Sequence, residues 1–388
     1  MSRKKTIRTI LHVSLDAFFV AVEQALKPSL RGQPIVVCGR LVNKQIVACP
    51  NYEARRLGIR QAMSISQARL IVPQIIILNA SYNYYEKFSE EFFKILSRFT
   101  DHIEPVSLDQ AYIDITDQQE NWISPEFMAN EIKKAIYKEL EITSSIGIAN
   151  NKVCAFIASQ INKPNGIIYV PWGKEKTWLQ NKPIAYLPGI GPRTRAILAK
   201  TNINTIGQLA CLSKELLIQT FGSCGQTIWY FANGIDNRQV ITPGQSKSVS
   251  RTFSYKYPTT DRDLVLSTFD NMLAKVCGHL RKNHKKGQTI FIRLVNANGV
   301  TYSRQKKLDF TAFNELDFYP TFRKLIYEIW PMSREFKTIS VGVSCLTRQS
   351  KQDNIFEHSF YKLKQIQSAI NKIRYHYGFS PAQSGFSL

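Results

Sequence analysis

Strand-like and helix-like segments alternate in short pieces through the first 170 residues, and this alternation limits the possible folds more than any other feature. In LHVSLDAFFVAVEQ, residues 11–24, polar and apolar side chains alternate, which predicts a strand with one buried and one polar face. Residues 84–100 carry apolar side chains at helical spacing, and residues 103–116 predict a strand pair with a tight turn near Asp109. We therefore expect an α+β fold in which helices cover a sheet.

The composition changes at NKPNGIIYVPWGKEK, residues 162–176, where proline and glycine are frequent. This break predicts a domain boundary near residue 170. A helical segment follows to about 240, then a polar linker, ITPGQSKSVS. Beyond it, helix-like and strand-like segments predict a small basic α/β domain over residues 250–380.

The segment LPGIGPRTRAIL, residues 187–198, has the form of a helix-hairpin-helix. Gly189 and Gly191 allow a tight turn with outward amides, and the proline after the second glycine marks a helix start. Such a hairpin binds a phosphate without reading bases, and Arg193 and Arg195 add positive charge. A plain helix–helix turn is the alternative.

The formal net charge of +22 favours a polyanionic partner, with a solvated basic surface as the alternative. The seven cysteines are scattered without C-x-x-C spacing, which argues against a disulfide framework and a zinc site. No apolar run is long enough to span a membrane, so we expect no membrane partner and a cytoplasmic location.

Six motifs together resemble the DinB-like branch of the Y-family translesion DNA polymerases, the DNA polymerase IV type: LHVSLDAFFVAVEQ, NYEARRLGIRQAM, EPVSLDQAYIDIT, IGIANNKVCAFIASQINKPNG, LPGIGPRTRAIL and SKSVSRTF. The resemblance covers essentially the whole chain. It implies a multidomain right-hand polymerase, associated with the nucleoid. The expected domains are a palm (6–15 and 81–170), fingers (16–80), a thumb with the helix-hairpin-helix (171–240), a linker (241–249), a little finger (250–380) and a tail (381–388).

The same resemblance raises a question about catalysis. Such polymerases hold two divalent cations with clustered carboxylates, and here only Asp109 is acidic at the three matching positions, since the others are Ser14 and Gln110. Mg²⁺ gains most of its protein binding from anionic oxygens, so the site should hold Mg²⁺ weakly or not at all. Asp16 lies two residues along the strand, about 6.6 Å from position 14, and like Asp114 it fits a structural role better.

Other family positions are retained. Tyr52, Arg55 and Lys163 match contacts to the triphosphate of a dNTP, and Phe19 matches the steric gate that excludes a 2′-hydroxyl. Phe156 stands where the family has a lysine. The residues expected to contact DNA are Gly189, Gly191, Arg193, Arg195, Lys247, Arg251, Arg293 and Arg304. The ending QSGFSL resembles a peptide that docks on the sliding clamp through Gln383, Phe386 and Leu388, or is the ordinary end of the little finger.

Together these features predict a protein that binds primer-template DNA and dNTP with catalysis lost or severely reduced. It would then work in translesion synthesis and DNA repair as an adaptor for an active DNA polymerase. The alternative is an active, error-prone polymerase that holds a metal, with Mn²⁺ favoured, through Asp109, Asp16 and the dNTP phosphates. A helix-hairpin-helix glycosylase or nuclease would explain the hairpin and the charge but not NYEAR, NKPNG or DAFF.

Overall fold

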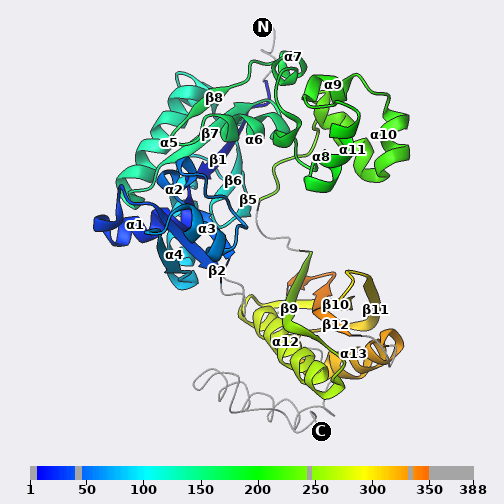
Figure 1. Ribbon diagram of the computed structural model, residues 1–388. Helices are drawn as coiled ribbons and strands as arrows, with labels where there is room; N and C mark the ends of the chain where they lie inside the picture. Colours follow the sequence, from blue (N-terminus) through cyan, green and yellow to red (C-terminus); the bar gives the residue numbers. More distant parts are fainter. Residues whose placement is uncertain (1–6, 40–45, 243–246, 331–334, 349–388) are drawn as a thin grey trace. The chain divides into compact units, whose positions relative to one another are not determined.

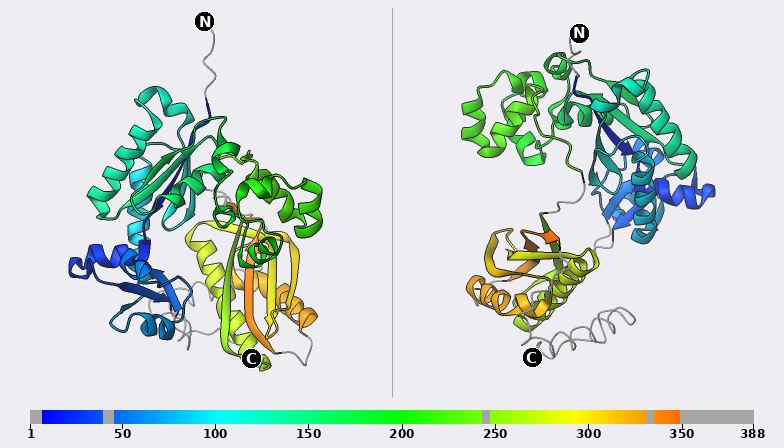
Figure 2. Two further views of the ribbon diagram at one scale, coloured as in Figure 1. Left: turned by 45° about the horizontal axis from the view of Figure 1, so that its top comes forward. Right: turned by 180° about the vertical axis from the view of Figure 1, so that it is seen from behind.

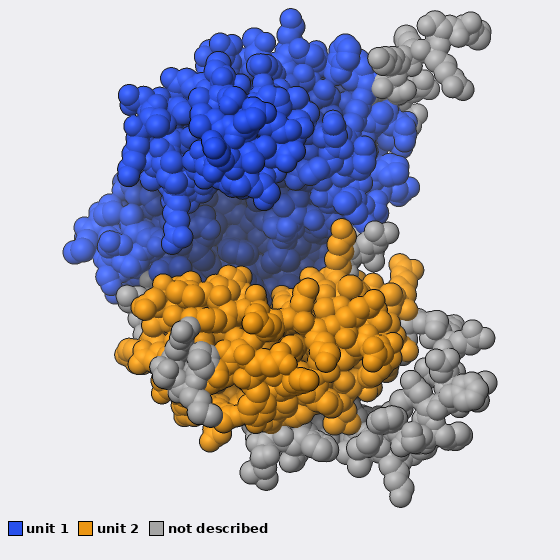
Figure 3. Space-filling view, turned by 90° about the vertical axis from the view of Figure 1, so that its right-hand side faces the viewer, with its two compact units in different colours: residues 1–243 blue, residues 244–388 orange. Residues whose placement is uncertain are grey.

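The computed structural model describes residues 7–39, 46–242, 247–330 and 335–348 (Figure 1). The chain divides into two compact units, residues 1–243 and residues 244–388, which are coloured separately in Figure 3. The first unit therefore continues past residue 170 and includes the helical segment that follows.

A five-stranded sheet forms the centre of the first unit, in the order β5-β6-β1-β7-β8. The pairs are antiparallel except β7–β8, which is parallel. The strands are β1 (Ile10–Leu15), β5 (Ile103–Ser107), β6 (Gln110–Asp114), β7 (Ser144–Ala149) and β8 (Ile167–Tyr169). The predicted strand pair with its turn at Asp109 is confirmed as β5 and β6.

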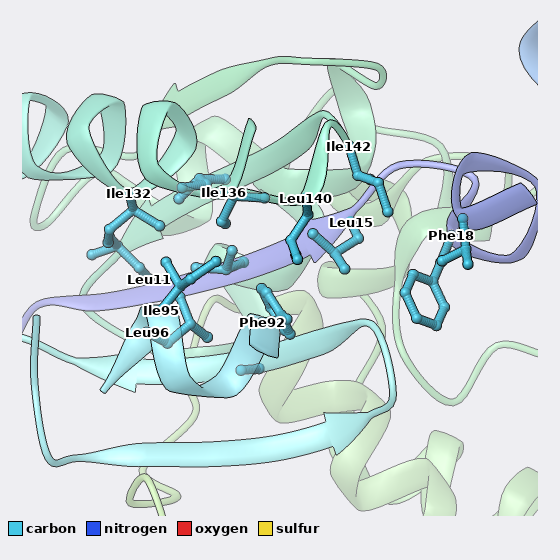
Figure 4. Packing of buried hydrophobic residues seen from close by; sticks show 14 of the residues in the cluster. Leu11, Leu15, Phe18, Phe92, Ile95, Leu96, Ile132, Ile136, Leu140 and Ile142 are labelled. Atoms are coloured by element: carbon cyan, nitrogen blue, oxygen red, sulfur yellow. The ribbon is translucent and has the colours of Figure 1, made fainter. Parts of the chain in front are cut away.

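Helices cover both faces of this sheet. Apolar side chains of α4 (Tyr82–Leu96) and α5 (Pro125–Leu140) pack with β1 in the main core, where Phe92, Ile95, Ile132 and Ile136 lie against Leu11 and Leu15 (Figure 4). The other face is covered by α6 (Lys152–Ile161).

The strand β1 is buried along its whole length, so the predicted polar face is buried as well as the apolar one. His12 and Ser14 have no exposed surface because β6 and β7 flank the strand and α6 packs over its polar face. A sequence alternation shows which side chains share a face, but not whether a helix covers that face.

Two further groups of elements complete the first unit. A small sheet, β3-β2-β4, and its neighbouring helices span residues 18–79: α1 (Phe18–Leu26), η1 (Pro28–Leu30), β2 (Ile35–Gly39), β3 (Ile46–Pro50), α2 (Tyr52–Arg56), α3 (Ile65–Ile71) and β4 (Ile76–Asn79). The 3₁₀ segment η2 (Thr116–Asn121) precedes α5, and five helices and η3 follow β8: α7 (Glu175–Leu179), η3 (Ile184–Tyr186), α8 (Pro192–Lys200), α9 (Ile206–Ala210), α10 (Lys214–Phe221) and α11 (Ser223–Ala232). The apolar side chains of the helices that follow β8 pack with those of α6 in one core.

The described residues of the second unit, 247–330 and 335–348, form an antiparallel sheet with two helices, seen in both views of Figure 2. The strand order is β11-β10-β12-β9, and the helices pack on one face around a core of their own. The elements are β9 (Ser248–Thr259), α12 (Arg262–Lys282), β10 (Lys285–Asn296), β11 (Thr301–Ala312), α13 (Glu315–Ile329), β12 (Phe336–Ser344) and β13 (Thr347–Arg348). The predicted α+β class is confirmed in both units.

Candidate functional site

The three positions expected to bind metal meet at one end of the central sheet. Ser14 pairs directly opposite Gln110 in the β1–β6 ladder, and the Leu15 amide donates a 2.9 Å hydrogen bond to the carbonyl oxygen of Asp109. The Asp109 carboxylate accepts a 2.6 Å hydrogen bond from the Ser107 hydroxyl. The turn between β5 and β6 thus brings Asp109 and Gln110 beside Ser14.

Lys163 reaches this place from the segment between α6 and β8. Its ammonium nitrogen donates a hydrogen bond to the Ser14 hydroxyl, with 2.6 Å between Nζ and Oγ. Burial lowers the pKa of Lys163, an effect that the charges of Asp16 and Asp109 oppose and that of Arg55 reinforces. The lysine is therefore a half-buried cation held on the residue that replaces the expected carboxylate.

Asp16 has a structural role, as the sequence suggested. Its carboxylate is 2% exposed and accepts hydrogen bonds of 2.8 Å from the Ser145 hydroxyl and 2.8 Å from the Asn165 amide. Asp114 lies at the other end of β6, opposite Ile10, and accepts hydrogen bonds from the amide and hydroxyl of Thr116. The Asp114 carboxylate therefore stabilises its own turn, whereas Asp16 links the end of β1 to β7 and to the segment before β8.

Candidate nucleotide contacts lie close to the same place. Arg55 stacks on the Tyr52 ring, 4.7 Å from its centroid, and donates a hydrogen bond to the Pro50 carbonyl. The Tyr52 hydroxyl is buried without a hydrogen-bond partner in the described residues. Burial, and then the nearby charge of Asp16, raises the pKa of Tyr52.

The two aromatic residues of the DAFF stretch take different positions. Phe18 is 4% exposed and belongs to the main core, while Phe19 is half-buried and stacks on the Tyr85 ring at 4.7 Å. The Tyr85 hydroxyl in turn donates a 2.8 Å hydrogen bond to Glu23. Phe19 is thus the less buried of the pair, and its role as a steric gate stays a prediction.

The donor set at Ser14, Asp109 and Gln110 does not fit a two-metal site. Two divalent ions held about 3.5–4 Å apart require several anionic oxygens, and this set has one carboxylate, while the serine oxygen already accepts a hydrogen bond from an ammonium group. Nowhere in the described residues do three or more His, Cys, Asp or Glu side chains gather in a way that could hold a metal ion.

A buried histidine lies behind the site on β1. The Ser159 hydroxyl donates to the Phe156 carbonyl, so it accepts from Nδ1–H of His12 at 2.7 Å. The other ring nitrogen of His12 is buried without a partner in the described part of the chain. Burial, reinforced by the charge of Lys163, lowers the pKa of His12 to about 3.

This histidine should make the fold sensitive to mild acid. Because the folded pKa lies below the unfolded value of 6.5, its stabilising effect is complete above pH 6.5 and declines as the pH falls towards 3. We expect the free energy of unfolding to fall by up to about 1.4 kcal/mol per pH unit from this group alone. Urea unfolding between pH 7.5 and 5 should show a shallower decline in His12→Asn, and equal slopes would contradict the prediction.

A buried ion pair fastens the end of the helical segment to the central sheet. The Lys152 ammonium donates to both carboxylate oxygens of Glu104 at 2.6 Å and to the Gln239 carbonyl at 3.2 Å. Glu104 also accepts a 2.6 Å hydrogen bond from the Ile241 amide. Gln239 and Ile241 are therefore held beside β5.

The predicted hairpin lies between η3 and α8. Gly189 has φ +92°, a conformation that favours glycine, whereas Gly191 is extended and serves as the N-cap of α8. Pro192 occupies the first turn of that helix, as predicted. Arg193 and Arg195 are exposed.

The expected DNA contacts of the second unit do not share one face of the sheet. Arg293 lies opposite Ser303 and Ser340 on the face away from the helices. Arg251 pairs with Val341, and Arg304 pairs with Ile292. Val341 and Ile292 point into the core, so the strand register places both arginines on that same side of the sheet, although their side chains are exposed. Lys247 is also exposed.

A groove on the open face of this sheet is lined by hydroxyl, amide, apolar and guanidinium groups, and Arg304 borders it together with Arg293. The groove includes Phe291 and Arg293, and Phe291 lies so close to Gly342 that a Cβ there would come within 2.2 Å of the ring. The serine and threonine residues of the groove are Ser250, Thr252, Ser303 and Ser340.

Two further sequence expectations concern the C-terminal tail and the membrane. The proposed clamp-binding residues Gln383, Phe386 and Leu388 lie outside the described residues. Within the described ranges, no helix has the length and apolar composition needed to cross a membrane.

Three parts of the site were missed from the sequence. The contact of Lys163 with Ser14, the Asp16 link to Asn165 and the Lys152–Glu104 pair all join segments far apart in the chain. Only the Lys152–Glu104 pair had an indication in the local sequence. Lys152 directly follows Asn151, the N-cap of α6, within the motif IGIANNKVCAFIASQINKPNG.

Three family models match the chain. Residues 13–160 match the impB/mucB/samB family, residues 246–355 match the C-terminal domain of that family, and residues 185–236 match the thumb domain of DNA polymerase iota.

Curated relatives match over nearly the full length. DNA polymerase IV of Dehalococcoides mccartyi strain CBDB1 is 36% identical over 381 residues, which is 98% of this chain and 97% of the relative. DNA polymerase IV of Desulfatibacillum aliphaticivorans is 34% identical, over 91% of this chain and 89% of the relative.

Solved structures agree. A Y-family DNA polymerase chimera of Dbh and Dpo4 superimposes with a TM-score of 0.75 at 26% identity, covering 88% of this chain and 99% of that one. An insertion ternary complex of Dbh DNA polymerase gives a TM-score of 0.66 at 26% identity, with coverage of 87% and 98%.

Proposed function

The chain belongs to the DinB-like branch of the Y-family DNA polymerases, and from that premise we propose that it binds primer-template DNA and an incoming dNTP but extends the primer slowly or not at all. Polymerases of this family use divalent metal ions. The fold is that of a right-hand polymerase with a thumb and a C-terminal sheet domain of the little-finger type. We place the palm, fingers, thumb and little finger at the ranges derived from the sequence.

One observation carries the proposed loss of catalysis. The Lys163 ammonium donates to Ser14 at 2.6 Å, at a position where the family has a carboxylate for metal. A neutral hydroxyl that already accepts from a cation is a poor ligand for Mg²⁺, and the opposite residue, Gln110, is neutral as well. Asp109 alone would remain as an anionic ligand.

The contacts of Asp16 also favour a protein without polymerase activity over an active polymerase. An active enzyme would need Asp16 to replace the missing carboxylate, but Ser145 and Asn165 each hold one of its two oxygens. Turning the carboxylate towards Asp109 would break both hydrogen bonds. We therefore propose that Asp16 keeps its structural role when DNA and nucleotide bind.

In the cell, such a protein would act as an adaptor at damaged DNA. We propose that the helix-hairpin-helix and the basic second unit hold the primer-template, while an active polymerase performs synthesis. The exposed Arg193 and Arg195 at α8, with Arg293 on the open sheet face, support the DNA contact. Docking of the C-terminal peptide on a sliding clamp belongs to the same proposal.

Binding to primer-template should depend steeply on salt. We expect the logarithm of the association constant to fall linearly with the logarithm of salt concentration. Each phosphate contacted should contribute about −0.9 to the slope. Replacing Arg193 and Arg195 with glutamine should reduce the magnitude of the slope by about 2 if each contacts one phosphate. Fluorescence anisotropy with a labelled primer-template measures the slope.

Lys94 provides a matched control because it is exposed on α4 and pairs with Glu91. The Lys94→Gln protein should keep the slope of the parent. A parent whose affinity barely changes with salt would contradict the proposed binding to the DNA backbone.

A further inference from the structure

The segment that carries Lys163 is fixed at several points. Asp16 accepts from the Asn165 amide at 2.8 Å and from the Ser145 hydroxyl, and the Gly166 amide donates to the same hydroxyl at 3.3 Å. Lys133, on α5, donates to the Asn165 carbonyl. The position of the Lys163 ammonium on Ser14 is therefore supported by contacts to Asp16, β7 and α5.

The charges around this ammonium are mixed, since the Asp16 and Asp109 carboxylates and the Arg55 guanidinium all influence it. An ammonium has three donors, and in the described residues only the one to Ser14 forms a hydrogen bond. The Arg55 guanidinium is near enough to influence Lys163 electrostatically. The Arg55 guanidinium stacks on the Tyr52 ring, and the Tyr52 hydroxyl is buried without a hydrogen-bond partner in the described residues.

We infer that this site binds the triphosphate of a dNTP without a divalent metal ion, with the Lys163 ammonium anchored on Ser14 as its fixed cation. The inference rests on the proposed nucleotide binding and adds its cation requirement. It explains the two unusual features together, because the hydroxyl that cannot hold a metal is the group that holds the lysine.

The identity of residue 14 decides this behaviour. A serine accepts the lysine hydrogen bond but leaves the positive charge of the ammonium available to phosphate oxygens. An aspartate at position 14 would form an ion pair with Lys163 in the absence of metal and would repel the phosphates. Metal would then be needed to offset that negative charge.

The test measures binding of the complementary dNTP to this protein on a primer-template with a dideoxy-terminated primer, in excess EDTA and in Mg²⁺. We expect dissociation constants for the parent that agree within about threefold in the two conditions. Ser14→Asp should bind about 10- to 100-fold more weakly in EDTA and recover in Mg²⁺, the range expected for one charged hydrogen bond. Lys163→Met should be weakened by a similar factor in both conditions.

Lys174→Met is the matched control, because Lys174 is an exposed lysine at the start of α7. Binding to the primer-template is measured for every variant, so that misfolding of Lys163→Met is recognised and Ser14→Asp then provides the test. A parent that binds dNTP at least tenfold more weakly in EDTA overturns the metal-free inference and leaves the proposed function standing. A parent that binds DNA but no dNTP in either condition overturns the proposed nucleotide binding itself.

Discussion

Replacing Ser14 with aspartate and Gln110 with glutamate should raise the rate of single-nucleotide primer extension in Mg²⁺ by at least about 10³-fold. The two residues lie opposite each other on β1 and β6, beside Asp109, so the double substitution places three carboxylates at one end of the sheet. Stabilisation of transition-state charge by bound metal contributes several kcal/mol, and about 1.4 kcal/mol corresponds to each tenfold in rate. Single-turnover extension of a labelled primer measures the effect.

The single substitutions serve as controls in this experiment. Each adds one carboxylate to Asp109, so each should give a much smaller gain than the pair. Adding Asp109→Ala to the double variant should return extension to the level of the parent. Rapid extension by the unmodified parent, equal to that of the double variant, would show that catalysis does not depend on these positions.

Replacing Lys152 with methionine should lower the free energy of unfolding of the first unit by about 3–5 kcal/mol. Lys152 is 3% exposed, and its ammonium holds both oxygens of Glu104 while it lies 4.8 Å from the centre of the Tyr112 ring. Removing one partner of such a pair leaves the other charge desolvated and unpaired. Urea unfolding followed by tryptophan fluorescence is suitable, because four of the five tryptophans lie in the first unit.

An exposed ion pair gives the comparison. Lys134 pairs with Glu131 one turn away on α5, and Lys134→Met should change the free energy of unfolding by less than about 0.5 kcal/mol. Adding Glu104→Gln to Lys152→Met should restore part of the loss, because the amide keeps an acceptor for Ile241 without a buried charge. A Lys152→Met protein as stable as the Lys134→Met protein would contradict the expected burial cost.

The elements that the sequence predicted correctly are those with strong local patterns. The apolar residues of α4 follow helical spacing: Tyr85, Phe92, Ile95 and Leu96 are buried, and Phe88 is half-buried against the same core. The turn at Asp109 and Pro192 at the start of α8 depend on neighbouring residues alone, and both were predicted correctly. In each case the physical cause lies within a few residues of its effect.

The features that the sequence did not predict depend on contacts between distant segments. Nothing near His12 indicates that α6 covers it, and nothing near Lys163 indicates that its ammonium reaches Ser14, which lies 149 positions away. The motif placed both residues in one site without giving their contact. The faces of Arg251 and Arg304 likewise follow from strand register, which a local alternation does not determine.

The complete burial of β1 has a consequence for how such a protein can evolve. This strand is held by β6 on one side and β7 on the other, so its backbone does not depend on the charge of residue 14 for its position. An exchange between serine and aspartate there alters chemistry while the ladder stays intact. Selection at residue 14 would therefore act on the chemistry of the site without first having to change the strand that carries it.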